Sequence, residues 1–68
     1  KLGQMNNAAK NFEKAIEINP GYTLAHSNLG LTLLDLEQKD EAIKCFKRVI
    51  SIEPKNPLAQ EKLKELSS

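Results

Sequence analysis

Hydrophobic positions along this chain follow the period of an α-helix in four successive segments. Segment 7–18 carries apolar residues at spacings of three and four, and segments 24–37, 41–52 and 57–66 repeat that arrangement. No stretch alternates apolar and polar residues with a period of two, so the pattern predicts no strand. We therefore expect an all-α fold of about four short helices. Neighbouring helices should be antiparallel, because the connections between them are short.

Residues that cap or stop helices separate these segments. Short polar side chains before each segment can accept a hydrogen bond from the first turn of the helix that follows. The predicted N-caps are Asn6 or Asn7, then Thr23, Asp40 and Asn56. Pro20 ends the first helix, because proline disfavours the helical conformation in the residue before it. Pro57 suits the first position of the last helix, where no backbone donor is needed.

Two stretches of the chain, residues 8–25 and 42–59, are copies of one pattern. The offset is 34 residues throughout, and no gap interrupts the alignment. Eight aligned pairs are identical: Ala8/Ala42, Lys10/Lys44, Phe12/Phe46, Ile16/Ile50, Ile18/Ile52, Pro20/Pro54, Leu24/Leu58 and Ala25/Ala59. A fixed period of this size is typical of helical arrays, in which each unit buries its apolar side against its neighbours.

A helix–turn–helix unit of this length resembles the tetratricopeptide repeat family. In residues 23–56 the positions that agree with the family are Leu29, Gly30 and Leu33 in the first helix, and Ala42, Phe46 and Pro54 in the second. His26 stands where the family favours tryptophan, and Val49 where it favours alanine. The resemblance implies a right-handed superhelix of helix pairs. Its first helices would line a concave groove that binds peptides or partner proteins.

The phase of the repeat divides residues 1–68 into three parts of a single domain. Residues 1–22 correspond to the second helix of a truncated repeat, residues 23–56 form one complete repeat, and residues 57–68 form a C-terminal capping helix. Lys64 lies one period after Gly30, where its bulk would obstruct the close approach of another helix. The chain starts at Lys1 rather than at a methionine, which indicates a fragment or a processed chain.

Charge and composition exclude several classes of partner. Ten basic and nine acidic residues leave a net charge of +1, which is too little for a nucleic-acid footprint. No apolar run is long enough to span a membrane, so we expect no membrane insertion. The single Cys45 cannot form an intrachain disulfide, and the polar N-terminus is not a signal peptide. These features favour a soluble protein in a reducing compartment, and we expect a cytoplasmic location.

The sequence indicates no catalytic, metal or cofactor site. It contains no nucleophile–base pair and no phosphate-binding loop. His26 is a lone histidine on an apolar side of its helix, and a metal site needs several converging ligands. Cys45 lies on another helix without a metal-binding spacing. We therefore expect a protein that is not an enzyme and needs no cofactor.

The resemblance implies a candidate binding surface for a protein or peptide. Its predicted residues are Leu24, Ser27, Asn28, Leu31, Leu34 and Asp35, followed by Lys62 with Glu61 and Glu65 on the next helix. Two of these have an alternative interpretation, because Leu31 and Leu34 could instead pack on neighbouring helices or on another chain. Asn28 can hydrogen-bond a ligand main chain. A clamp for a C-terminal carboxylate is disfavoured, since Leu58 occupies a position where that clamp needs lysine.

A second hypothesis is self-association. The first helix has no preceding helix to cover its apolar side, so we expect Met5, Ala8 and Phe12 to be partly bare. A bare apolar edge on a stacking protein can pair with another copy, which would give a homo-oligomer, either a dimer or a longer superhelix.

Overall fold

The computed structural model describes residues 2–67, with side chains described from Asn6 to Ser67, and that part of the chain is all-α. Its helices are α1 (Leu2–Ile18), α2 (Thr23–Asp35), α3 (Lys39–Ile52) and α4 (Pro57–Leu66). No strand occurs within residues 2–67, so the prediction of an all-α fold is confirmed.

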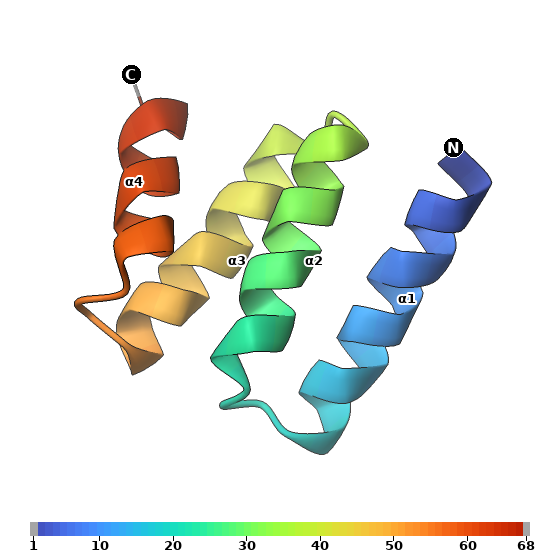
Figure 1. Ribbon diagram of the computed structural model, residues 1–68, viewed down its shortest axis with the longest axis horizontal. Helices are drawn as coiled ribbons and strands as arrows, with labels where there is room; N and C mark the ends of the chain where they lie inside the picture. The colour runs from blue at the N-terminus through green and yellow to red at the C-terminus, as the bar shows by residue number, and fades with distance from the viewer. Residues whose placement is uncertain (1, 68) are drawn as a thin grey trace.

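The helices lie side by side in chain order, and each runs antiparallel to the one before it (Figure 1). α1 packs against α2, α2 against α3 and α3 against α4. The molecule is a slab of 31 × 28 × 15 Å, so its thickness is little more than one helix with its side chains. Contacts between successive helices dominate, as they do in a linear array of repeats.

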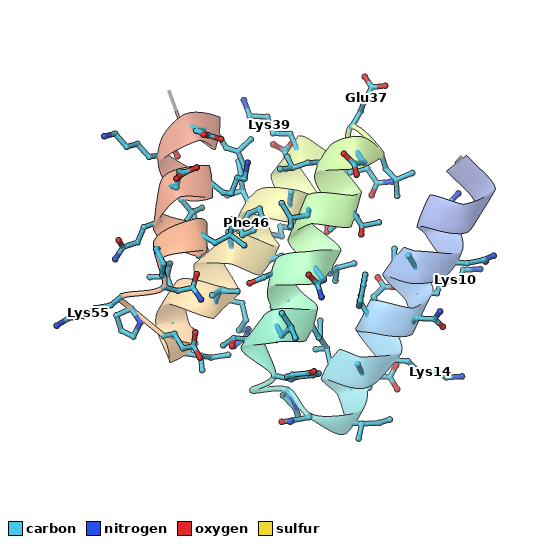
Figure 2. All side chains as sticks on the ribbon, in the orientation of Figure 1. Lys10, Lys14, Glu37, Lys39, Phe46 and Lys55 are labelled. Atoms are coloured by element: carbon cyan, nitrogen blue, oxygen red, sulfur yellow. The ribbon has the colours of Figure 1, made fainter. Side chains whose placement is uncertain are left out.

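The core is centred on α3. Ala42, Phe46 and Val49 are each 0% exposed, and Figure 2 shows Phe46 in the interior of the slab. Buried residues of the other helices complete the cluster: Ala9, Leu29, Leu33 and Ala59. The spacing of three and four on α3 brings its buried side chains to one side of the helix. Short helices are marginal in isolation, so packing of this side against the other helices stabilises α3.

Close approach of α2 to α3 depends on Gly30. A Cβ atom at this position would lie 2.8 Å from Cζ of Phe46, closer than carbon atoms can approach without movement. The absence of a side chain at Gly30 therefore sets the distance between the two helices. Phe46 fills the space that this glycine leaves.

Helix α1 begins at Leu2, five residues before the predicted start at position 7. Asn6 and Asn7 lie inside the helix, so the prediction that one of them is its N-cap is wrong. The apolar spacing of three continues backwards from Ala8 through Met5 to Leu2, and no proline interrupts it. The polar pair is therefore a surface feature of a longer helix.

Two other predicted N-caps are also wrong. The N-cap of α2 is Tyr22, and Thr23 is the first helical residue, whose hydroxyl donates to Oε2 of Glu53 at 3.0 Å. The N-cap of α3 is Gln38, and Asp40 lies in the first turn, where a carboxylate still interacts favourably with the helix dipole. The Thr23 hydroxyl has a tertiary partner, which no local pattern could indicate.

The predicted cap of α4 is confirmed. Oδ1 of Asn56 accepts a hydrogen bond from the backbone N–H of Ala59 at 3.0 Å, and Pro57 occupies the first turn. This arrangement satisfies one of the free donors at the helix start.

Helix α2 ends at Asp35, two residues before the predicted end, in a turn that satisfies its last carbonyls. The N–H of Glu37 donates to the carbonyl of Leu34 at 3.0 Å, and that of Gln38 to the carbonyl of Leu33 at 2.8 Å. These two bonds define a Schellman motif. Glu37 occupies the position with left-handed backbone, at φ 61°, which usually belongs to glycine.

We expect Glu37→Gly to stabilise the protein by about 1 kcal/mol, because glycine adopts the left-handed conformation without the strain of a Cβ. Glu37→Ala is the control, since it keeps the Cβ and removes only the exposed carboxylate; its expected effect is close to zero. Urea unfolding followed by circular dichroism measures both. Equal midpoints for the glycine and alanine variants would contradict the strain argument.

Candidate partner-binding face

The predicted groove residues occupy α2 and α4, two parallel helices whose starts are tied together by Glu53. Its two carboxylate oxygens accept hydrogen bonds from opposite sides: Oε2 from the Thr23 hydroxyl and Oε1 from Nδ2 of Asn56, each at 3.0 Å. Because Thr23 begins α2 and Asn56 caps α4, both helices start at the same edge of the slab (Figure 1).

We call the set of residues at corresponding positions of these two helices the α2–α4 face. Its members recur at helical spacings of three and four and comprise Leu24, Asn28, Leu31 and Asp35 on α2, with Leu58, Glu61, Lys62 and Glu65 on α4. Ser27, another residue of the predicted set, is buried and offers no free side chain. Leu34 is half-buried against the core, as Leu31 is, so part of its surface is used internally.

Leu24 is the most accessible apolar residue on the face, with 56% of its surface exposed. Leu31 is half-buried and packs against the hydrophobic core, so part of its surface is used internally. Tyr22, which the helical periodicity does not select, is 44% exposed at the N-cap of α2, two residues before Leu24. An aromatic residue in a turn gives no periodic signal. Its exposure is the observation that suggests a contact role, because tyrosines are enriched at interfaces.

Asn28 lies half-buried between these apolar residues. Among the described residues, its side-chain amide has no hydrogen-bond partner, although its backbone carbonyl accepts from the Thr32 hydroxyl at 2.9 Å. A half-buried amide offers two donors and an acceptor, which are the groups that an extended peptide main chain requires.

Charged side chains of both signs are present on these helices, and Lys64 is exposed on α4 between Glu61 and Glu65 in the sequence. Asp35 and Glu61 are exposed carboxylates without an ion pair in the described part of the chain. Lys62 lies 3.5 Å from Oε1 of Glu65, and such an exposed pair contributes little to stability. The face thus combines apolar residues with charges of both signs.

The outer edge of α1 differs from the equivalent part of α3. Ala42, Phe46 and Val49 are fully buried, whereas Ala8, Phe12 and Ala15, which precede them by one period, are only half-buried. Ile18 is 83% exposed, against 38% for Ile52. In the described residues α1 packs mainly on α2, while α3 is covered by both α2 and α4. The side chain of Met5, the third predicted edge residue, lies outside the described residues.

His26 and Cys45 line a cleft of about 560 Å³ between α1 and α3, on a floor formed by α2. His26 is buried, and its Nε2 donates to the carbonyl of Pro20 at 2.9 Å, so the ring has a structural role. Burial, and then the carboxylates of Glu41 and Glu13, raise the pKa of the Cys45 thiol. A thiol held protonated is a poor nucleophile. Among the described residues, no group of three or more potential ligands could hold a metal ion.

We expect Cys45 to react slowly with iodoacetamide at pH 8 in the folded protein, with the rate rising only above the ordinary pKa of a thiol. The same chain in urea should react faster, because unfolding removes the burial. Between the pKa of the thiol in the unfolded chain and its raised pKa in the folded protein, only the folded state keeps the proton. The free energy of unfolding should therefore fall as pH rises through that interval. Equal alkylation rates with and without urea would contradict the assigned environment.

Antiparallel helices that repeat at a constant offset and contact mainly their neighbours define the class of helical-repeat scaffolds. Residues 23–56 match the family described as tetratricopeptide repeat, and residues 1–37 match a second description of the TPR repeat. The chain belongs to the tetratricopeptide repeat family. Human tetratricopeptide repeat protein 6 is 33% identical over 55 residues, which cover 81% of this chain and 11% of that protein.

Repeats of this family generally mediate protein–protein interaction and are typically non-catalytic scaffolds. The chain spans about a tenth of the length of the human relative, 11%. No helix in the described range has both the length and the apolar character needed to cross a membrane.

Proposed function

We propose that the α2–α4 face binds a peptide segment of a partner protein. The observation that most directly supports this proposal is the side-chain amide of Asn28, which has no hydrogen-bond partner among the described residues. It lies between exposed Leu24 and half-buried Leu31 on one side of α2. Apolar anchors give affinity by burial, while the amide can hydrogen-bond the main chain of an extended segment. Glu53 links the starts of the two helices, because its carboxylate accepts hydrogen bonds from Thr23 and Asn56.

The test is affinity capture with the protein and three single variants. Leu24→Ala and Asn28→Ala should each lose the proteins that the parent captures, because each removes one of the proposed contacts. Ile52→Ala is the matched control, because it truncates another exposed aliphatic residue, which lies on α3 rather than on α2 or α4. If Ile52→Ala loses the same proteins, or if neither face variant loses any, the assignment of the face is wrong.

Leu31→Lys should weaken peptide binding while costing about 1 kcal/mol of stability or less, because a half-buried lysine can extend its charged end into water. Thermal unfolding and binding to the captured partner measure the two effects separately. A loss of several kcal/mol, on the scale of a core truncation, would show that Leu31 belongs to the core rather than to the face.

A second candidate function is self-association through α1. It is favoured by the unequal burial of equivalent residues: Ala8 and Phe12 are half-buried, whereas Ala42 and Phe46 are fully buried. A helix from another copy could cover this edge as α2 covers α3. Sedimentation velocity over a range of concentrations tests it, with Phe12→Ala as the variant that should shift the equilibrium toward monomer. A strictly monomeric parent chain would eliminate this candidate.

A further inference from the structure

We infer that the cleft between α1 and α3 receives an extended segment of a partner protein, in which a basic and an acidic side chain flank an apolar one. None of the residues assigned to the α2–α4 face lines this cleft, so it is a second site that does not depend on the proposed function. The observations behind it are an apolar floor and two walls of opposite charge.

The floor of the cleft is apolar. Leu29 and Leu33 of α2 are buried beneath it, and Ile16 of α1 and Cys45 of α3 are half-buried at its sides. The volume of the cleft, about 560 Å³, falls within the range of sites that hold a ligand, about 300–1,000 Å³. The cleft therefore has room for an apolar side chain that packs on α2.

The two walls carry charges that are not neutralised across the cleft. The α1 wall contributes Glu13 and Glu17, and the α3 wall contributes Glu41, Lys44 and Arg48. Lys44 lies 3.4 Å from Oε1 of Glu41 on its own helix, so these two charges largely cancel. Glu13, Glu17 and Arg48 form no ion pair among the described residues. The α1 wall is thus acidic and the α3 wall basic.

The lysines of α1 do not line the cleft. Figure 2 shows Lys10 and Lys14 projecting from α1 on the side away from α2. Both line a separate depression on the outer surface of α1. The charges that face the cleft from α1 are therefore the two carboxylates alone.

Charges of both walls act within one part of the cleft. Burial, and then the carboxylates of Glu41 and Glu13, raise the pKa of the Cys45 thiol. Glu13 belongs to α1 and Cys45 to α3, so the α1 wall lies within electrostatic reach of the opposite wall. One bound segment can therefore meet both walls.

The placement of the charges sets the direction and spacing of that segment. Because the opposite charges lie on opposite walls, a segment that meets both crosses the cleft from α1 to α3. Each wall packs on α2, so their axes are at most about 20 Å apart, at about 10 Å for each packed pair. In an extended chain, residues i, i+2 and i+4 point to the same side and span about 13 Å. A basic residue, an apolar one and an acidic one at these positions meet the α1 wall, the floor and the α3 wall in turn.

Segments with two like charges are disfavoured in the cleft. A segment with two basic residues places one of them against Arg48, and a segment with two acidic residues places one against Glu13 and Glu17. Complementary charge favours the right partner, and repulsion suppresses the wrong ones.

The experiment uses three peptides of equal length, labelled with fluorescein at the N-terminus and otherwise built from serine and glycine. Each carries a central leucine, and the residues two positions before and after it are Lys and Glu, Lys and Lys, or Glu and Glu. Fluorescence anisotropy should show the Lys/Glu peptide binding about fivefold more tightly than either of the others. The preference should shrink as salt is raised, because the charged groups are exposed.

Two double variants of the walls should redirect the preference. Glu13→Lys combined with Glu17→Lys makes both walls basic, so the Glu/Glu peptide should become the tightest binder. Lys44→Glu combined with Arg48→Glu makes both walls acidic, so the Lys/Lys peptide should bind most tightly. All four residues are exposed, so circular dichroism should show unchanged helix content in both variants.

The matched control is Glu37→Lys combined with Glu61→Lys. It reverses the same number of exposed carboxylates as the α1 variant, at positions that do not line the cleft. The control should keep the preference for the Lys/Glu peptide.

Cys45 reports where the peptide binds, because it lines the cleft. A saturating concentration of the Lys/Glu peptide should slow the alkylation of Cys45 by iodoacetamide. Leu24→Ala, which truncates an apolar residue of the α2–α4 face, should leave the affinity for this peptide unchanged.

The outcomes separate the cleft from the α2–α4 face. Equal affinity for the three peptides, no binding at all, or an order of affinities that the wall variants leave unchanged overturns the inference about the cleft and leaves the proposed function standing. An unchanged alkylation rate with saturating peptide means that the peptide binds elsewhere, which overturns it as well. If Leu24→Ala abolishes binding, the α2–α4 face holds the peptide, so the proposed function is supported and the inference about the cleft is wrong.

Discussion

Phe46→Ala is expected to unfold most of the protein at 25 °C. Phe46 is fully buried at the centre of the core, where it fills the space opposite Gly30. Truncation of a buried phenylalanine costs about 3–5 kcal/mol, which is comparable with the whole stability that a core of this size supplies, about 3–5 kcal/mol. Circular dichroism with urea titration should show a greatly reduced helical signal even without denaturant.

The chain contains its own control for this prediction. Phe12 occupies the equivalent position one period earlier but is only half-buried, because no described helix covers its outer side. Phe12→Ala removes the same atoms and should cost less than half as much, leaving a cooperative transition at lower urea. Equal losses for the two variants would mean that burial does not distinguish the two positions.

Gly30→Leu is expected to unfold the central α2–α3 pair. Even the first added carbon would lie 2.8 Å from Cζ and 3.0 Å from Cε2 of Phe46. The ring is 0% exposed and cannot swing aside, so α2 would have to move away from α3. Overpacking of this kind costs about 1–3 kcal/mol for small additions, and a leucine adds three further carbons.

A graded series tests the packing explanation for Gly30. Gly30→Ala gains about 1 kcal/mol in helix propensity and loses a similar or larger amount in the contact with Phe46, so its net loss should be small. Gly21→Ala is the control, because its added Cβ would have only Oδ1 of Asn19 within reach, at 4.0 Å. The order of stability should be Gly21→Ala, then Gly30→Ala, then Gly30→Leu. A melting temperature for Gly30→Leu within a few degrees of the parent would refute the argument.

The helices themselves could be predicted because their signals are local. Apolar spacing located all four helices, and Asn56 followed by Pro57 marked the start of α4 correctly. The constant offset between the copies also pairs Phe46 with Phe12, so these two residues occupy equivalent positions in successive units. Helix ends were less predictable. Thr23 has the side chain of a cap, but its hydroxyl bonds Glu53, which is thirty residues away along the chain.

The residues of the proposed binding face could be predicted only in outline. The residues on α2 followed from aligning the chain with the repeat of the family, because residues four and seven positions apart share one side of a helix. Their exposure did not follow: Ser27 is buried and Leu31 is partly used by the core. Tyr22 was missed because a turn residue belongs to no periodic pattern. Whether the side-chain amide of Asn28 has a hydrogen-bond partner likewise depends on the atoms around it in the folded chain, which the sequence does not reveal.

The sequence by itself determined the all-α class, the repeat period and the family to which the chain belongs, because each depends on residues close together or at a fixed offset. The tertiary structure decided which copy of each repeated residue is covered. Phe12 and Phe46 are the same residue in the same local pattern, yet only Phe46 is fully buried. Burial depends on neighbours brought together by folding, and α3 has helices on both sides, whereas α1 packs mainly on α2 among the described residues.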